Sequence, residues 1–255
     1  MSDLAVLAVG FGVIPLASIL LYSFRDWITA HGELAWGGLA GVIAFLGLSH
    51  SMTLVLENKP FLFGGVGGFV TDSFLLFGLA LGGIIGWLLL EGRFIRAEPS
   101  RILWAAAAFL LLHSFGDGLV LGSDFVGGAL PVVPIDTVSV SATVAHRLVE
   151  GAIVLVPAFA ARWKLRSAFL LLFVSLVSIP AGYVPSLLVG SVGIVDGSAA
   201  LLTLSTFLAA VEASLGLLLL IRGFLPLASS DRGTRWMIWT AVGFIGISVI
   251  HFLVE

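Results

Sequence analysis

The sequence predicts an all-α membrane protein that crosses the bilayer eight times, with its N- and C-termini outside the cytoplasm. Three observations carry this prediction. Only 11% of the 255 residues are charged, whereas soluble domains carry about 25%. Long apolar stretches recur along the whole chain, and each can cover a hydrocarbon core about 30 Å thick. The basic residues gather in alternate loops between these stretches.

The composition excludes several classes of protein. A chain in which 59% of the residues are hydrophobic cannot keep a soluble surface hydrated, so an ordinary globular enzyme and a disordered protein are excluded. Its 12 Lys and Arg residues are too few for nucleic acid to be a partner. Because Cys is absent, we expect no disulfide framework, zinc finger or thiol nucleophile. The expected surroundings of the chain are a lipid bilayer.

Eight stretches have the length and apolar character of membrane spans. In chain order they cover about residues 3–23, 35–56, 72–91, 102–122, 139–160, 168–190, 198–221 and 235–254. The first stretch opens Met-Ser-Asp and lacks the basic start of a signal peptide, so we interpret it as a retained helix. Short loops join the stretches, and we therefore treat residues 1–255 as one transmembrane domain.

The positive charges predict the orientation of the chain in its membrane. If the N-terminus is outside, the inner loops contain ten of the twelve Lys and Arg residues, and the outer loops hold only Lys59. The twelfth basic residue, Arg147, lies inside the fifth span. Cytoplasmic loops of membrane proteins carry an excess of Lys and Arg. This bias predicts that both termini are outside, and we expect a multi-pass protein of the cell membrane.

Glycines line one face of two predicted spans. Gly78, Gly82 and Gly86 repeat every four residues in the third span, and Gly37 and Gly41 do the same in the second. Faces without side chains let helix backbones approach closely. Plain helix packing explains such faces, and a surface along which two blocks slide is the functional interpretation.

The ionisable residues at membrane depth carry the chemistry, because a charge in the bilayer centre is costly. The fourth span contains His113-x-x-x-Asp117 followed by glycine, and the fifth contains His146-x-x-x-Glu150 followed by glycine. Residues four apart share one face of a helix. Two such helices side by side bring two imidazoles and two carboxylates to one point. That donor set suits zinc, iron or manganese.

Other interpretations of these residues stay open. Each pair could belong to a structural hydrogen-bond network or to a proton relay without metal. Glu212, central in the seventh span, is expected to pair with Arg147 or to line the ion path. His50, in the outer part of the second span, is a candidate entrance ligand or a partner in a helix–helix hydrogen bond. His251 lies near the end of the last span, where we expect interface water.

The paired motifs resemble those of the Zrt/Irt-like (ZIP) divalent-metal transporters. The resemblance runs through six residues of the fourth and fifth spans, namely His113, Asp117, Gly118, His146, Glu150 and Gly151. The second span, rich in Gly and Ala and containing His50, is also similar to the corresponding span of that family. The resemblance implies eight spans, termini outside, and a metal site formed by His113, Asp117, His146 and Glu150.

The chain departs from the family pattern at three positions around this site. Ser114 stands where the family has Asn, Arg147 stands at the position after the second His where the family has a polar or acidic residue, and Val149 replaces a Pro. Arg147 is a permanent cation where a second metal would take a ligand. The resemblance therefore implies that the first of the family's two adjacent metal sites is kept and the second is lost.

Together these features predict a transporter that moves a divalent metal ion toward the cytoplasm, with zinc ahead of iron and manganese. The metal is the cargo, and no separate cofactor and no enzymatic activity are expected. The resemblance implies alternating access around one midplane site, in which spans one, four, five and six carry the ion against the other four. The alternative is a zinc-dependent intramembrane hydrolase, which would activate water on the metal. A homodimer is left open.

Overall fold

The computed structural model describes residues 3–65, 68–90, 98–124, 137–191, 195–230 and 233–254. Every regular element within these ranges is a helix. Seven helical stretches in them are long and apolar enough to cross a membrane, which confirms an all-α integral membrane protein. They are Gly32–Phe63, Gly68–Leu90, Pro99–Leu119, Ser141–Ala160, Leu165–Ser186, Ala199–Ala228 and Arg235–Leu253. They correspond to the second to eighth predicted spans.

The first predicted span coincides with a helix, α1 (Asp3–Ser23). The part of α1 whose side chains are described, Gly12–Ser23, is apolar but shorter than the seven long stretches. The eighth crossing of the membrane therefore stays a prediction, as does the orientation of the termini.

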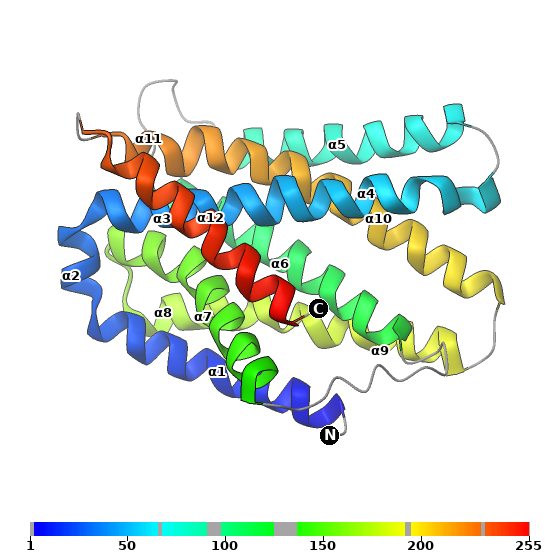
Figure 1. The fold of residues 1–255 in the computed structure, drawn as a ribbon, viewed down its shortest axis with the longest axis horizontal. Helices are drawn as coiled ribbons and strands as arrows, with labels where there is room; N and C mark the ends of the chain where they lie inside the picture. Colours follow the sequence, from blue (N-terminus) through cyan, green and yellow to red (C-terminus); the bar gives the residue numbers. More distant parts are fainter. Residues whose placement is uncertain are drawn as a thin grey trace.

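The remaining helices follow in a simple up-and-down order. They are α2 (Arg25–Ala30), α3 (Gly32–Ile43), η1 (Ala44–His50), α4 (Ser51–Asn58), η2 (Lys59–Gly65), α5 (Gly68–Leu90), α6 (Pro99–Asp124), α7 (Thr137–Ala160), α8 (Leu165–Leu176), α9 (Ser178–Ser191), α10 (Val195–Leu218), η3 (Leu219–Phe224), α11 (Leu225–Ala228) and α12 (Arg235–Val254). The predicted spans lie side by side, and each runs opposite to the one before, with α3 to α4 forming one span and α8 to α9 another (Figure 1). The short helices α2 and α11 lie at the same end of the bundle, on the left of Figure 1.

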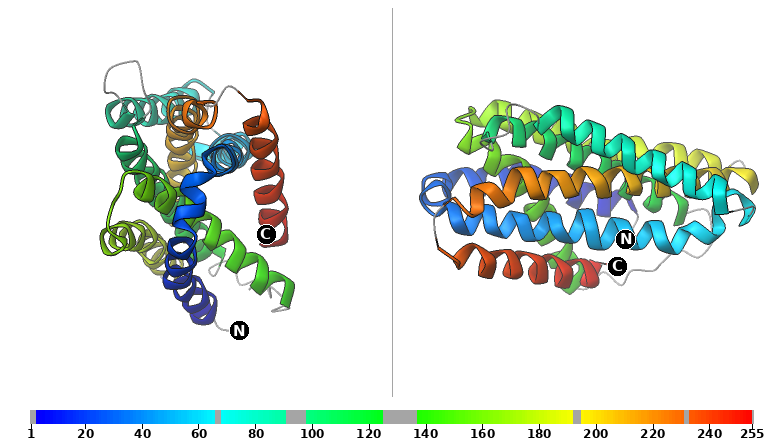
Figure 2. Two further views of the ribbon diagram at one scale, coloured as in Figure 1. Left: turned by 90° about the vertical axis from the view of Figure 1, so that its left-hand side faces the viewer. Right: turned by 90° about the horizontal axis from the view of Figure 1, so that it is seen from above.

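The helices form two groups. In the first, α6 packs on α9, and α1, α7 and α8 pack on one another and on α6 or α7. In the second, α12 packs on α3, and α10 packs on α5, α4 and η1. We call these groups the α6–α7 half and the α3–α12 half. They meet where α6 contacts α10 and where α7 contacts α12, and Figure 2 shows the same bundle from its end and from above.

The glycine faces bring helix backbones together within one half. A Cβ atom on Gly82 of α5 would collide with the backbone of Val211 in α10, and one on Gly41 of α3 would collide with that of Thr240 in α12. Both contacts lie inside the α3–α12 half. The glycine-lined face of the third span is therefore a tight packing surface within that half and does not lie between the two halves.

Three predicted spans change helix type or divide, and in the sixth the prolines of the sequence are those that break helices. The second contains a π-helical turn, η1, in which Ser51 donates from Oγ to the carbonyl oxygen of Leu46, five residues earlier, at 2.7 Å. The seventh ends in a similar turn, η3. The sixth divides at Val177 into α8 and α9, shortly before Pro180, whose missing N–H cannot continue the helix ladder. Because π-helical turns shift the register of side chains, η1 sets where His50 lies.

Candidate metal centre

The two sequence motifs meet on neighbouring helices. His113 and Asp117 lie on α6, His146 and Glu150 lie on α7, and these two helices are in contact. Both histidines and Glu150 are buried, with relative exposures of 2%, 5% and 0%. The Asp117 side chain keeps 25% of its exposure. The i, i+4 spacing thus does what the sequence predicts: it turns one imidazole and one carboxylate of each helix toward the same space.

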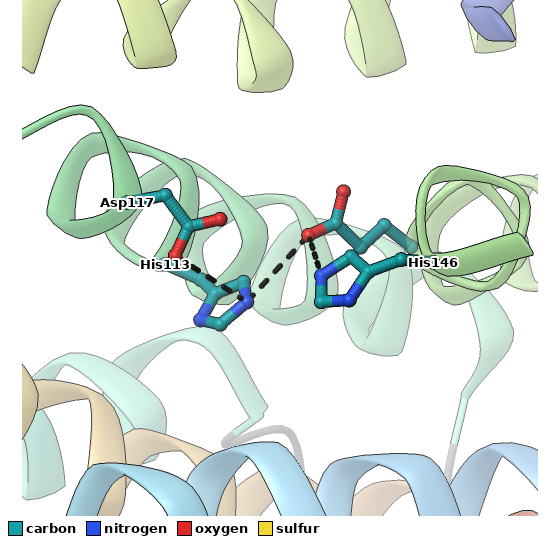
Figure 3. Close-up of side chains that lie close together, drawn as sticks. His113, Asp117 and His146 are labelled. Atoms are coloured by element: carbon teal, nitrogen blue, oxygen red, sulfur yellow. Dashed lines mark hydrogen bonds and ion pairs between the residues drawn. The ribbon is translucent and has the colours of Figure 1, made fainter. Parts of the chain in front are cut away.

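Four ligand atoms, one from each residue, lie within 4.8 Å of one another. Nε2 of His113 is 3.5 Å from Oε1 of Glu150 and 4.0 Å from Oδ1 of Asp117. Nε2 of His146 is 3.0 Å from the same Glu150 oxygen. Figure 3 shows the His113 and His146 rings facing the carboxylates from two helices. The two motifs therefore converge on one point.

The spacing of these atoms suits a tetrahedral ion. With bonds of about 2.0–2.1 Å, the ligand atoms around zinc are separated by roughly 3.3 Å. The 3.0 and 3.5 Å distances are close to this value, and the wider pairs, all within 4.8 Å, would draw in when an ion binds. Nε2 of His113 is buried and makes no hydrogen bond with any described residue. A buried nitrogen without a hydrogen bond is unusual. It is available to a metal ion.

Glu212 of α10 fixes the orientation of the first histidine. Nδ1–H of His113 donates to Oε1 of Glu212 at 3.0 Å, and this carboxylate is also buried. With the proton held on Nδ1, the lone pair of His113 Nε2 points into the site. Carboxylates that hold the outer nitrogen of a histidine ligand in this way are common around metals, where they raise the basicity of the ligand.

Arg147 of α7 binds the outer oxygens of both acids. Its Nη1 donates to Oε2 of Glu150 at 2.6 Å and to Oδ2 of Asp117 at 3.4 Å. Its Nη2 also donates to Oδ2 of Asp117, at 3.4 Å. The other oxygen of each acid, Oε1 of Glu150 and Oδ1 of Asp117, faces the histidines. The guanidinium thus lies beyond the carboxylates and does not occupy the space among the four ligand atoms.

The prediction that Glu212 pairs with Arg147 is wrong. The sequence favoured an ion pair between Glu212 and Arg147, but Glu212 bonds to His113 and Arg147 bonds to Asp117 and Glu150. The reason is geometric. Arg147 is one helical turn from Glu150 on α7, whereas α10, which carries Glu212, packs on α6 beside His113.

The other candidate residues lie around the site. Ser114 is fully buried next to His113, and its Oγ makes no hydrogen bond with a described residue. His50 is partly buried, and its ring centroid is 6.0 Å from that of His113. The candidate entrance residue therefore borders the metal centre.

The prediction that His251 meets water at the membrane interface is wrong. Its side chain is buried, with 8% relative exposure, because α12 packs along α3 and α7. Its Nε2 is 2.9 Å from Nδ1 of His50. The sequence repeats the His-x-x-x-acid spacing here, in His251 and Glu255, but without a following glycine and at the end of the span. That spacing, and the presence of an ionisable side chain in an apolar span, are the signals that could have marked it.

Comparisons with known proteins leave the family open. No family model matches the chain, and a search of curated proteins finds no match either. The functional argument therefore rests on the site itself.

Proposed function

We propose that this chain is a divergent relative of the ZIP transporters and carries a divalent metal ion, zinc first and then iron or manganese, toward the cytoplasm. The observation that carries the proposal is the buried set of His113, Asp117, His146 and Glu150, whose ligand atoms lie within 4.8 Å of one another. Two carboxylates offset the charge of the ion, and two imidazoles replace part of its hydration shell. The direction of transport, toward the cytoplasm, is what the resemblance of the two motifs to those of the family implies.

The division of the bundle supports alternating access. All four proposed ligands belong to the α6–α7 half, while Glu212, which orients His113, belongs to the α3–α12 half. Movement of one half against the other would change the environment of the ion without dismantling its ligand set. This matches the assignment of spans one, four, five and six to a block that carries the ion.

The arrangement of the helix ends supports the proposed orientation in a cell membrane. The junctions around α2 and α11, and those between α7 and α8, lie at one end of the bundle (Figure 1). The sequence of these junctions contains Arg25, Arg162, Lys164 and Arg166, and η2 at the other end begins with Lys59. With basic loops inside, helix α1 as an eighth span would put both termini outside.

Transport is preferred to intramembrane hydrolysis for a chemical reason. A catalytic zinc keeps an open position and needs a nearby general base. The two acids here face the histidines as ligands, and Glu212 is engaged by His113. None of the three carboxylates, Asp117, Glu150 and Glu212, is therefore placed to act as the general base.

Flux into sealed vesicles tests the proposal. The purified full chain is reconstituted into liposomes that contain a fluorescent zinc indicator, and zinc is added outside. We expect indicator signal with the wild type and its loss with Asp117→Asn, while Asp72→Asn, which changes an acid paired with Lys59 away from the site, keeps it. Absence of flux in the wild type, together with turnover of lipid or peptide, would favour the hydrolase.

A further inference from the structure

Four of the five histidines of this chain lie together. The ring centroids of His50 and His251 are 4.3 Å apart, and those of His113 and His146 are 6.3 Å apart. The two pairs are linked by His50 to His113 at 6.0 Å and by His146 to His251 at 5.6 Å. Only His113 and His146 belong to the proposed ligand set, so the role of the other pair is open.

His50 and His251 belong to the opposite half of the bundle from the metal centre. His50 ends η1 in the second span, and His251 is near the end of α12. Nε2 of His251 and Nδ1 of His50 are 2.9 Å apart, so one of these nitrogens donates its proton to the other. The ring of Phe45 packs against both, at 5.4 Å from His251 and 6.5 Å from His50. The pair is thus held with two nitrogens facing each other.

We infer that His50 and His251 form a second binding site for a divalent metal ion, on the α3–α12 half. It lies beside the site of His113, Asp117, His146 and Glu150, which we call the main centre. The inference takes its ion from the proposed function, but binding at the pair does not require transport. An ion inserted between the two nitrogens needs both lone pairs, so the proton of the hydrogen bond moves to the outer nitrogen of the same ring and both imidazoles stay neutral. The nitrogens would then separate from 2.9 Å to roughly the 3.3 Å spacing of zinc ligands, with water completing the coordination.

The His146 ring connects the pair to the main centre. Nε2 of His146 lies 3.0 Å from Glu150, while its Nδ1 is buried and makes no hydrogen bond with a described residue. The same ring is 5.6 Å from His251. An ion that leaves the pair therefore reaches the main ligand set by way of the His146 ring, which contacts both sites.

The difference in charge gives the two sites different roles. The main centre contains the carboxylates of Asp117 and Glu150, whereas the two ligands of the pair are neutral imidazoles. The main centre offers four ligand residues, two of them anionic, whereas the pair offers two imidazoles and no negative charge that would offset the charge of the ion. A site with fewer ligands and no counter-charge holds a divalent ion less tightly, and an ion path needs sites that release as well as bind. The pair is therefore a weaker site through which the ion passes on its way to or from the main centre.

Copper binding to the pair alone is the first test. His31→Gln, His113→Gln and His146→Gln together leave His50 and His251 as the only imidazoles among the five of the chain. Cu²⁺ is the probe, because nitrogen ligands bind it more tightly than other first-row divalent ions. We expect the electron paramagnetic resonance spectrum of the full chain in detergent to show coupling to two nitrogens. Adding His251→Gln should remove one coupling and weaken binding at least about 10-fold.

Absence of nitrogen coupling in the folded triple variant would overturn the inference, as would coupling that persists unchanged after His251→Gln. Because the triple variant could fail to fold, a second variant keeps the main centre: His50→Gln with His251→Gln. At saturating zinc we expect equilibrium dialysis to give two ions per wild-type chain and one per variant chain. Equal numbers of ions in the two proteins would also overturn it.

The second site and the proposed function can each be wrong while the other is right, and the experiments distinguish these cases. A chain that binds zinc at the pair but gives no flux into vesicles would contradict transport and support the second site. A chain that gives flux but holds one zinc with or without the pair would support transport and overturn the second site.

Discussion

Each acid of the site divides its two oxygens between different partners. Glu150 turns Oε1 toward both histidines and Oε2 toward Arg147. Asp117 turns Oδ1 toward His113 and Oδ2 toward Arg147. Arg147 therefore acts as a counter-charge that holds the acids in place without blocking the space between the ligand atoms. An ion at the centre and the guanidinium behind the acids can be present together.

Removing the charge of either acid should remove most metal binding. Asp117→Asn and Glu150→Gln keep the shape of the side chain but replace one anionic oxygen by an amide. Losses around a metal's outer contacts typically cost about 10–100-fold in affinity, and we expect these changes to cost at least that in zinc binding measured by calorimetry. Asp72→Asn is the matched control. Near-normal affinity in both site variants would show that the ligand assignment is wrong.

Glu212 should tune zinc affinity without changing the number of ions bound. Gln at this position still accepts the hydrogen bond from His113 Nδ1–H but carries no charge, whereas Leu accepts none. We therefore expect affinity to fall in the order wild type, Glu212→Gln, Glu212→Leu, with Glu212→Leu reduced by about 10–100-fold. Calorimetric titration with zinc measures both the affinity and the number of ions bound. Equal affinities of the three proteins would remove Glu212 from the site.

Arg147 should limit the main centre to one ion. A second metal bridging Asp117 and Glu150 would need the outer oxygens that the guanidinium binds at 2.6 and 3.4 Å, and it would meet a fixed positive charge there. We expect anomalous diffraction from zinc-soaked crystals to give one peak within bonding reach of the two acids. Arg147→Glu should add a second peak. Two such peaks in the wild type would contradict this role of Arg147.

At the scale of helices, the sequence predicted the spans well and their interruptions poorly. Apolar length alone places the seven long stretches, because a buried or lipid-facing helix needs little else. The π-helical turn before Ser51 is accompanied by a side-chain bond back to Leu46, and no residue pattern marks it. Likewise, the spacing of His113 and Asp117 shows which face they share. The contact of His251 with His50 appears only once α12 packs on α3.

The effect of replacing a glycine of α6 on stability should depend on whether that glycine faces α9. Gly118 of α6 faces the backbone of Ile179 in α9, where a Cβ would collide, whereas a Cβ on Gly116 meets nothing within 4 Å. We expect Gly118→Ala to destabilise the protein by about 1–3 kcal/mol or more, because α6 and α9 must separate. Gly116→Ala should be neutral or stabilising by up to about 1 kcal/mol, since Ala favours helix.

Thermal unfolding of the two alanine variants in detergent checks this packing prediction. The pair of changes is matched in chemistry and lies two residues apart on one helix, so a difference between them reports on the contact with α9. Equal melting temperatures would mean that α6 and α9 do not approach as closely as the structure has them.

For the molecule as a whole, the two ends of the bundle differ in charge, and this difference should set its orientation. Ten of the twelve Lys and Arg residues belong to the loops predicted to be inside. Because Cys is absent, single cysteines can be introduced and labelled with a reagent that does not cross membranes. We expect Gly65→Cys and Asp196→Cys to react in intact cells, and Ser100→Cys and Ser230→Cys to react only after permeabilisation. Since α1 must then cross the membrane to bring the N-terminus outside, a cysteine at Ser2 should react in intact cells as well. Labelling at Ser230 but not at Gly65 would invert the topology, and with it the direction in which the metal ion moves.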